Sequence, residues 1–362
     1  MLGFGNNRSS NENKYMTQQK TILFVTPQMS GFALNDLNIL KSEYKIILNV
    51  YNWNNKYLTP FNLIHQFFFI AFNIFKINKI IIEFGGYWSL IPAIFGKLFR
   101  KRTIIICHGT DCAYLPSLNY GNLGKKYIKL FCKFSYDLSD LICPVSESLI
   151  QVKNKFHLKN NEVNQGILSF FPNLKTPFEV INNGLDLDFW TNDKYNKRKN
   201  TFLAVFSEKQ YQLKGGDLIL TIAKRFKECS FEIVGLEYPE FLYDKPKNIS
   251  FLGKLNREEL IYKYTQSEFY LQLSSFEGFG LSLCEAMLCR CIPIGSSVNM
   301  IPEIIGKNGY ILEEKNSKQL ELIIKEALEL ENKELVAKKA RQSIINRFSL
   351  EKRKMNLLKV VK

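Results

Sequence analysis

The sequence contains no Cys-x-x-Cys pair, although it has eight cysteines, most of them within apolar runs. Neither a zinc site nor a disulfide framework therefore has support, and the cysteines are predicted to be buried thiols in a reducing compartment. An uninterrupted apolar run long enough to span a membrane is also lacking. The best candidate, FNLIHQFFFIAFNIFKINKIII at 61–82, is interrupted by His65, Lys76 and Lys79. It is predicted to form a helix followed by a buried strand.

The first residues, MLGFGNNRSSNENKYMTQQK, lack the continuous apolar core of a secretory signal. We expect a flexible tail over residues 1–19 and a cytoplasmic location. No repeat of short period is evident along the chain.

Acidic residues are few relative to basic ones, which gives a formal net charge of +15. Residues 1–183 carry 20 Lys and Arg against 10 Asp and Glu, an excess of +10, and the remainder carries 29 against 24, an excess of +5. This balance favours anionic partners: nucleic acid, an acidic membrane or phosphorylated small molecules. Because no nucleic-acid-binding motif is evident, nucleic acid is not expected as a partner. Peripheral association with an anionic membrane, at the inner face of the cell membrane, stays open.

Short apolar, β-branched runs alternate with longer helical patterns in both halves of the chain, from KTILFVTP to DLICPVS and again from TFLAVFSE to CIPIGSS. Such alternation predicts parallel strands covered by helices, that is, an α/β fold. We expect two Rossmann-like, doubly wound domains facing a central cleft, at residues 20–183 and 201–345. A linker is expected at 184–200, and a C-terminal helix at 346–362 is expected to pack back on the first domain.

The segment SSFEGFGLSLCEA, at 274–286, sets two acids around the run Gly278-Phe279-Gly280. A strand is expected to lead into this loop, and a helix to begin near Leu281. The glycines would let backbone approach a ligand closely, and the free N–H groups of the helix would suit phosphate. Glu285 would lie one turn into the helix and accept hydrogen bonds from hydroxyl groups, whereas Glu277 would lie in the loop. Both acids are equally well explained as solvated or helix-stabilising groups.

A second segment, SEKQYQLKGGDLILTIAKRF, places Lys209 and Lys214 in a loop before a helix. Two cations there would neutralise a departing diphosphate without a bound metal. Solvated loop lysines are the simpler interpretation of this segment alone. Gly235 ends a strand in SFEIVGL, where it would allow close approach of a ligand or simply make a turn.

In the first half, IIICHGTDCAYL places His108 directly after a continuous apolar strand, at an end that faces the predicted cleft. This histidine would donate a hydrogen bond to a sugar or transfer a proton, unless it is only satisfied by backbone. Gly31 would let the first loop approach a donor phosphate or an acceptor. The aromatic run FGGYW at 84–88 suits an acceptor groove and core packing equally well.

Taken together, the order of these segments resembles the family 4 glycosyltransferases of GT-B fold, over roughly residues 20–360. The most specific part is the pattern from Glu277 to Glu285, with EGFGL and EAM. Further segments fall in the expected order: KGGD after Lys209, VSESL at 145–149, NNGLDLDF at 182–189, FLGKL at 251–255, IPE at 301–303 and NGYIL at 308–312.

The resemblance implies that a hexose-type sugar is transferred, with retention, from a UDP- or GDP-sugar held mainly by the second domain. The acceptor would be a glycan or a lipid-linked glycan, and no metal or other cofactor would be required. Glu285 would bind the ribose, Lys209 and Lys214 the diphosphate, and Glu277 the sugar hydroxyls. His108 would contact the donor sugar, and Asp111 follows it in the same segment. Phosphate and sugar would also meet the backbone of Gly278, Phe279, Gly280 and Leu281.

Three departures from the family pattern stand out. Lys209 occupies a place usually filled by arginine, so bidentate phosphate contact is lost while the charge remains. Arg290 follows the helix where glycine is usual, so a positive φ there would cost on the order of 1 kcal/mol. Asn299 and Met300 stand where glycines are common, and are expected to reshape the wall near the donor sugar.

The sequence leaves three further functions open. A hydrolase would use the two acids across a glycosidic bond, but the lysines and the second Rossmann-like half would then have no role. A nucleotide-sugar-dependent epimerase of the same fold is the second, and a non-catalytic protein that binds anionic membrane or nucleic acid is the third. Asp186 and Asp188 form an Asp-x-Asp pair, which we assign to linker structure rather than to a metal site. Abundant Lys, Asn and Ile hint at an AT-rich bacterial source and hence at cell-surface polysaccharide biosynthesis.

Overall fold

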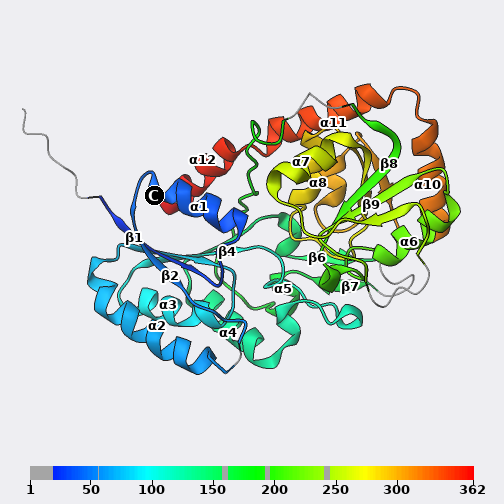
Figure 1. The fold of residues 1–362 in the computed structure, drawn as a ribbon. Coiled ribbons are helices and arrows are strands. Elements are labelled where there is room, and N and C mark those ends of the chain that lie inside the picture. Colours follow the sequence, from blue (N-terminus) through cyan, green and yellow to red (C-terminus); the bar gives the residue numbers. More distant parts are fainter. Residues whose placement is uncertain (1–18, 56, 157–161, 192–195, 240–244) are drawn as a thin grey trace, which may run out of the picture.

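A computed structural model describes residues 19–55, 57–156, 162–191, 196–239 and 245–362. Two parallel β-sheets, each covered by helices, lie side by side in this structure (Figure 1). The α/β architecture predicted from the alternating apolar runs is therefore confirmed. The tail expected at residues 1–19 lies outside the described residues except for its last position.

The first sheet has five parallel strands in the order β2-β1-β3-β4-β5. Its strands are largely apolar, as expected where helices cover both faces of a sheet, and β1, β3 and β5 are buried along their whole length. Helix α1 lies on one side of the sheet, and α2, α3 and α4 lie on the other (Figure 1). The elements are β1 (Thr21–Thr26), α1 (Gly31–Lys41), β2 (Lys45–Val50), α2 (Thr59–Asn73), β3 (Lys79–Glu83), α3 (Tyr87–Leu98), β4 (Arg102–Cys107), α4 (Lys126–Leu138) and β5 (Leu141–Pro144).

The helix and buried strand expected in the long apolar segment are α2 and β3. No helix in the described part of the chain is long and apolar enough to cross a membrane. All eight cysteines are free and buried, as their apolar surroundings predicted.

The second sheet has six strands in the order β10-β9-β8-β11-β12-β13, with parallel pairing throughout. Because its strands are parallel, the loops after β8 and β11 leave the same end of the sheet, and this end faces the first half of the chain. The elements are β8 (Arg198–Val205), α6 (Gly216–Arg225), β9 (Ser230–Val234), β10 (Ile249–Phe251), α7 (Arg257–Gln266), β11 (Ser267–Gln272), α8 (Leu281–Leu288), β12 (Ile292–Ser296), α9 (Ile301–Ile305), β13 (Tyr310–Leu312) and α10 (Ser317–Glu329).

Shorter elements complete the described chain. Strands β6 (Val152–Asn154) and β7 (Val163–Gln165) form a small antiparallel pair that is followed by α5 (Ile167–Phe170). The 3-10 turns are η1 (Ile74–Lys76), η2 (Pro116–Leu118), η3 (Asn122–Gly124), η4 (Glu147–Leu149) and η5 (Glu208–Gln210).

The chain crosses between the two halves twice, and the crossing segments pair with each other. Leu185 exchanges backbone hydrogen bonds with Phe348 and Leu350 on the return crossing, between α11 (Lys333–Arg347) and α12 (Leu350–Val361). Helix α12 then packs on α1 of the first half, as expected for the C-terminal helix (Figure 1). The linker was expected to extend to residue 200, but β8 already begins at Arg198. Within the linker, Asp186 accepts a hydrogen bond from the backbone N–H of Phe189.

A buried ion pair holds α12 in this position. The Arg353 guanidinium binds both carboxylate oxygens of Asp36 on α1, and both side chains are 2% exposed. Arg353 also donates to the backbone carbonyls of Ile181 and Asn182, just before the first crossing. Because both charges are satisfied, the pair ties the end of the chain to α1 and to the crossing segment.

Arg290, directly after α8, has φ of 62°, in the left-handed region that favours glycine. We expect Arg290→Gly to raise the free energy of unfolding by up to about 1 kcal/mol, because glycine adopts this conformation without strain. Arg290→Ala is the matched control: it removes the same side chain but keeps the strain. Denaturant unfolding of both variants checks this, and equal stability of the two would show that the backbone at this position is not strained.

Candidate active site

A cavity of about 160 Å³ lies between the two halves of the chain. Its walls come from the start of α1, the loops after β4, β8 and β11, the start of α8 and the segment that contains Asn183. Of the predicted site residues, His108, Lys214, Glu277, Phe279, Gly280 and Leu281 line it, together with Phe32, Asn183, Gln272 and Ser282. Other cavities are larger, but this one is lined by charged and polar side chains that were predicted from the sequence as site residues.

Lys214 and Glu277 meet at one side of this cavity. The Nζ of Lys214 lies 2.5 Å from Oε2 of Glu277, and both side chains are 15% exposed. The same oxygen accepts a hydrogen bond of 2.8 Å from Gln272. The Glu277 N–H donates to the side chain of Asn299, one of the two residues expected to reshape this wall. The cation and the acid are therefore held in place before any ligand arrives.

Helix α8 begins at Leu281, as predicted, with its N-terminal end at the cavity. Its N-cap residue, Gly280, has φ of 108° and contributes no side-chain cap, so the first N–H groups are not satisfied by a side chain at that position. Unsatisfied amides and the helix dipole together favour an anion at this point. The arrangement adds a second, uncharged source of positive potential beside Lys214.

Gly278 lies where the two halves touch. A Cβ at this position would overlap the carbonyl oxygen of His108, and one at Gly109 would lie 3.0 Å from the Cα of Gly278. Ser146, in the VSESL segment, donates a hydrogen bond of 2.8 Å to the Gly278 carbonyl. Glycine at this position therefore lets the backbones of the two halves approach each other closely.

His108 follows β4, and its imidazole packs against two aromatic rings that also contact each other. The ring centroids of Phe32 and Phe84 are 4.3 and 4.5 Å from that of His108. Its Nε2 lies 2.6 Å from Oε2 of Glu83, the last residue of β3, and the two side chains are 4% and 0% exposed. Nδ1 is buried and makes no hydrogen bond within the described chain.

Burial governs the ionisation of this pair. It lowers the pKa of His108 to about 4, so the imidazole is neutral near pH 7. The pKa of Glu83 is raised well above its usual range by burial and by the nearby carboxylate of Asp36. His108 is thus a neutral hydrogen-bonding group rather than a cation.

Asp111 braces the loop that carries His108. One of its carboxylate oxygens accepts from the backbone N–H groups of His108 and Gly109, and the other from that of Gly85. Cys107 and Cys112 lie close enough to Asp111 to share a metal ion with it. Burial, however, raises the pKa of both thiols, that of Cys107 to about 11. The donors are therefore protonated sulfur and a carboxylate already occupied by backbone, which suits a structural role.

Five predicted residues are absent from the cavity lining. Gly278 lies at the interface described above, Glu285 lies farther along α8, and the other three lie elsewhere. Lys209 is exposed on η5. Gly31 begins α1, and a Cβ there would meet no atom within 4 Å. Gly235 has φ of 99° after β9, and a Cβ would lie 2.7 Å from the Phe206 carbonyl oxygen, so the turn alone accounts for glycine. Of the two predicted phosphate-binding lysines, only Lys214 reaches this cavity.

Glu285 lies one turn along α8 from the cavity, where its Oε2 is 3.2 Å from the hydroxyl of Tyr264. Burial raises the pKa of Glu285 to about 7, while the Tyr264 hydrogen bond and the charge of Arg257 act in the opposite direction. The two acids that flank the glycine run therefore have different surroundings: Glu277 is ion-paired in the cavity, and Glu285 is buried beside a tyrosine.

Several site residues were missed by sequence reasoning. Glu83 ends a continuous apolar strand, the same signal that singled out His108, and could have been found on that basis. Gln272 is a polar residue at the end of the apolar strand β11, and Asn183 lies within the NNGLDLDF segment. No sequence pattern singled out Phe32, because an aromatic residue after the first strand is equally typical of a buried core position.

Comparison with known proteins places the second half of the chain in a family. Residues 190–347 match the family described as glycosyl transferases group 1. This region is similar to the group 1 glycosyltransferases. It contains Lys214, Glu277, the start of α8 and Glu285, so the resemblance inferred from these motifs is confirmed.

One curated relative of this chain is N-acetyl-alpha-D-glucosaminyl L-malate synthase from Bacillus anthracis, which is 28% identical over 273 residues. That match covers 70% of this chain and 65% of the relative. O-antigen chain mannosyltransferase B from Escherichia coli is 35% identical over 65 residues, covering 18% of this chain and 17% of the relative. The chain thus spans less than two thirds of the length of these relatives.

Solved structures extend the likeness to both halves of the chain. Sucrose-phosphate synthase from Thermosynechococcus elongatus superposes with a TM-score of 0.71 at 13% identity, covering 95% of this chain and 98% of the other. Anabaena HepE in complex with UDP-glucose superposes with a TM-score of 0.69 at 14% identity, covering 95% and 99%. These likenesses establish the GT-B fold of two facing Rossmann-like halves.

The raised pKa of Glu285 predicts a pH dependence of stability. The folded protein retains this proton up to about pH 7, whereas a solvated glutamate loses it near pH 4.5. Stability therefore falls as pH rises through this window. We expect Glu285→Gln to exceed the wild type by about 1–3 kcal/mol well above pH 7 and to differ little near pH 4.5.

Denaturant unfolding at both pH values measures this difference. Glu313→Gln, which neutralises an exposed acid of the same half, is the matched control and is expected to show no such gain. Equal stability of Glu285→Gln and wild type at high pH would mean that the carboxyl is solvated in solution.

Proposed function

We propose that the protein is a retaining, metal-independent glycosyltransferase that moves a hexose from a UDP- or GDP-sugar to a glycan or lipid-linked glycan acceptor. Cell-surface polysaccharide biosynthesis is the proposed setting, with the protein in the cytoplasm and in peripheral contact with the membrane. The family of residues 190–347 supports transfer of a sugar. The observation that carries the proposal is the placement of Lys214, Glu277 and the start of α8 around one cavity between the halves.

Each of these groups has a defined task in the proposed reaction. Lys214 and the amides at the start of α8 stabilise the charge that develops on the departing nucleotide diphosphate. Glu277 accepts hydrogen bonds from sugar hydroxyls, and His108, which lines the cavity from the opposite half, contacts the donor sugar. The acceptor hydroxyl forms the new glycosidic bond at the anomeric carbon as the bond to the diphosphate breaks.

The size of the cavity fits only part of the donor. At about 160 Å³ it is smaller than the roughly 300 Å³ or more of typical small-molecule sites, so it suits the sugar and adjoining phosphate. The nucleoside would extend along α8 toward Glu285, whose carboxylate would accept hydrogen bonds from ribose hydroxyls. Lys209 would then approach the diphosphate only when a ligand orders η5 against it.

Hydrolysis by the two acids is disfavoured by their surroundings. A glycosidase needs its two carboxyl groups on either side of one scissile bond. Glu277 lies in the cavity in an ion pair with Lys214, whereas Glu285 is absent from the cavity lining and bonds to Tyr264. The two acids are therefore better explained as binding different parts of one donor than as acting together on one glycosidic bond.

Removing the cavity lysine tests the assignment of the leaving-group site. We expect Lys214→Ala to lower kcat/KM for sugar transfer by roughly a hundredfold to a thousandfold, because one preorganised positive group is lost from the leaving-group site. Lys214→Arg keeps the charge and should retain more activity. Transfer and donor hydrolysis with a panel of UDP-, GDP- and ADP-sugars provide the measurement.

Lys227→Ala, which removes an exposed lysine of the same half, is the control and should leave the rate unchanged. Full activity of Lys214→Ala with every accepted donor would contradict the role of the lysine.

Chelation tests whether Lys214 and the helix amides act in place of a metal. We expect dialysis against EDTA to leave the transfer rate nearly unchanged, since the proposed leaving-group stabilisation comes from the chain itself. The rate is measured with the donor identified in the panel, before and after readdition of Mg²⁺ or Mn²⁺. Loss of activity that is restored by either ion would contradict the proposal.

A further inference from the structure

Helix α2 presents apolar side chains to solvent. From Thr59 to Asn73 it has no charged residue. Phe61, Phe68 and Phe72 are 69%, 53% and 79% exposed, and Phe75 directly after the helix is 84% exposed. Because these residues recur every three to seven positions, they lie on one side of the helix. That side is the one a surface helix ordinarily fills with charged groups.

The apolar surface continues onto the end of α3. Phe75 and Phe99 pack edge to face with ring centroids 5.7 Å apart, and Leu98 beside them is 71% exposed. A cavity of about 770 Å³ runs along α2 and is lined mainly by its aromatic and aliphatic side chains, Phe61, Ile64, Phe68, Phe69 and Phe72 among them. A continuous apolar patch of this kind marks an interaction surface, unlike single exposed residues.

Cations border this patch, and acids are few in the sequence around it. A second cavity, of about 590 Å³, is lined by Lys97, Arg100, Lys101 and Arg102 at the end of α3, and by one acid, Asp140, whose carboxylate accepts a hydrogen bond from the Thr103 N–H. Between residues 44 and 110 the only acid is Glu83, which is fully buried against His108. This segment therefore presents no acidic side chain that would repel an anionic surface.

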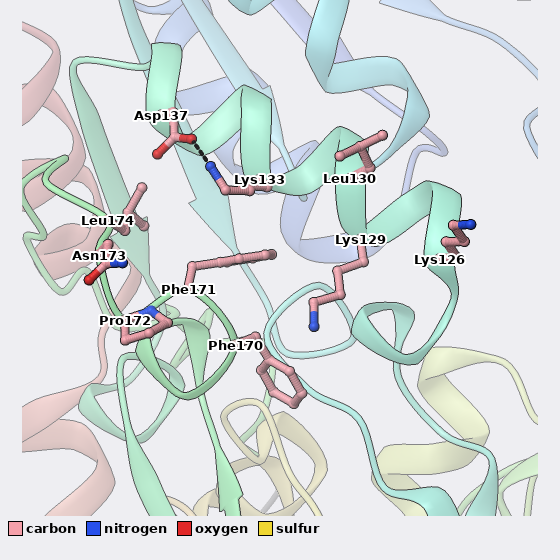
Figure 2. A pocket seen from close by; sticks show the side chains of 10 residues that line it. All are labelled: Lys126, Lys129, Leu130, Lys133, Asp137, Phe170, Phe171, Pro172, Asn173 and Leu174. Atoms are coloured by element: carbon pink, nitrogen blue, oxygen red, sulfur yellow. Dashed lines mark hydrogen bonds and ion pairs between the residues drawn. The ribbon is translucent and has the colours of Figure 1, made fainter.

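Helix α4 adds basic and aromatic side chains on the same side of the first sheet (Figure 1). Lys126, Lys129 and Lys133 follow one another along it beside a cavity of about 290 Å³, shown in Figure 2. Lys133 is paired with Asp137, and the Nζ of Lys129 lies 5.4 Å from the centre of the Phe170 ring. On the outer side of α4, Tyr127, Leu130 and Phe134 are exposed.

We infer that the outer surface of α2, α3 and α4 docks on an anionic lipid bilayer, with the α2 aromatics in the interfacial region and the basic residues at lipid phosphates. We call this surface the α2 face: Phe61, Ile64, Phe68, Phe72 and Phe75, bordered by Lys76, Lys97, Leu98, Phe99 and Arg100. An uncharged, one-sided helix of 15 residues suits a position parallel to the interface. Aromatic side chains favour that boundary, and each nearby lysine or arginine adds attraction to anionic lipid.

Charge complementarity distinguishes a bilayer from a second copy of the chain. A twofold dimer through the α2 face would bring the same patch of each copy together, and with it the same excess of cations. Residues 44–110 offer no exposed acid to pair with them, and nearby Asp137 is already paired with Lys133, while Asp140 accepts from the Thr103 N–H. An anionic membrane supplies both an apolar interior for the phenylalanines and phosphates for the cations.

Docking would hold the first half of the chain at the surface where a lipid-linked acceptor is embedded. This consequence rests on the proposed function, whereas the docking itself depends only on the α2 face. The two are separable by experiment, because docking requires neither a nucleotide-sugar nor an acceptor.

Vesicle flotation tests the inference with the full chain. Wild type is expected to float with vesicles of phosphatidylcholine and phosphatidylglycerol, and more weakly as salt is raised. Phe68→Ser with Phe72→Ser should lower the partition coefficient by at least about tenfold, since each exposed phenylalanine loses its transfer into lipid. Lys76→Glu with Lys97→Glu should also weaken binding, most strongly at low salt.

The matched control replaces two exposed leucines of the other half, Leu322→Ser with Leu335→Ser, and is expected to bind as wild type does. Absence of wild-type binding, or equal binding by the Phe68 and Phe72 variant, would overturn the inference. So would a wild-type dimer in light scattering that this variant converts to a monomer without any binding to vesicles.

Donor hydrolysis, measured in the same samples, separates this inference from the proposed function. If the Phe68 and Phe72 variant loses vesicle binding but hydrolyses the nucleotide-sugar as wild type does, the α2 face is supported and the catalytic site is intact. If wild type binds vesicles but acts on no nucleotide-sugar, docking is supported and the proposed function fails.

Discussion

The close contact between Gly278 and the backbone of His108 sets the form of the cleft. With no side chain between them, the glycine loop of the second half lies directly against the strand end of the first. Ser146 donates across this contact, and Asn154 of the first half donates to the Ser275 carbonyl of the second. The Arg353 and Asp36 ion pair fastens α12 to α1 behind it. His108, Glu277 and Lys214 consequently surround one cavity although they are up to 169 positions apart in the chain, from 108 to 277.

Burial then gives the polar groups of the site different chemical characters. His108 is neutral because it is buried against Phe32 and Phe84, and its Nε2 contacts Glu83. Glu277 remains ion-paired with Lys214, whereas Glu285 is buried beside Tyr264. Two glutamates only eight positions apart thus suit different parts of one donor, and a shared acid–base pair is not needed to explain them.

Sequence alone could predict those features that depend on local patterns. Continuous apolar runs predicted the strands, and the glycine run predicted the start of α8 at Leu281. Arg290 was singled out because glycine is usual at this helix end, and its φ of 62° is the strained conformation whose cost was considered. Long-range pairings could not be predicted in this way. The Glu83 and His108 contact joins two strands, and the exposed position of Lys209 depends on how η5 packs; no local periodicity encodes either. The α2 face was hidden because an apolar helix is ordinarily taken to be buried.

The central claim is that Lys214 and the start of α8 hold the diphosphate of a nucleotide-sugar between the two halves. A crystal structure with bound UDP or GDP tests it most directly. The account predicts the phosphates beside Nζ of Lys214 and the amides at the start of α8, with the ribose hydroxyls near Glu285. A nucleotide bound away from this cavity, with the Lys214 and Glu277 ion pair undisturbed, would contradict it.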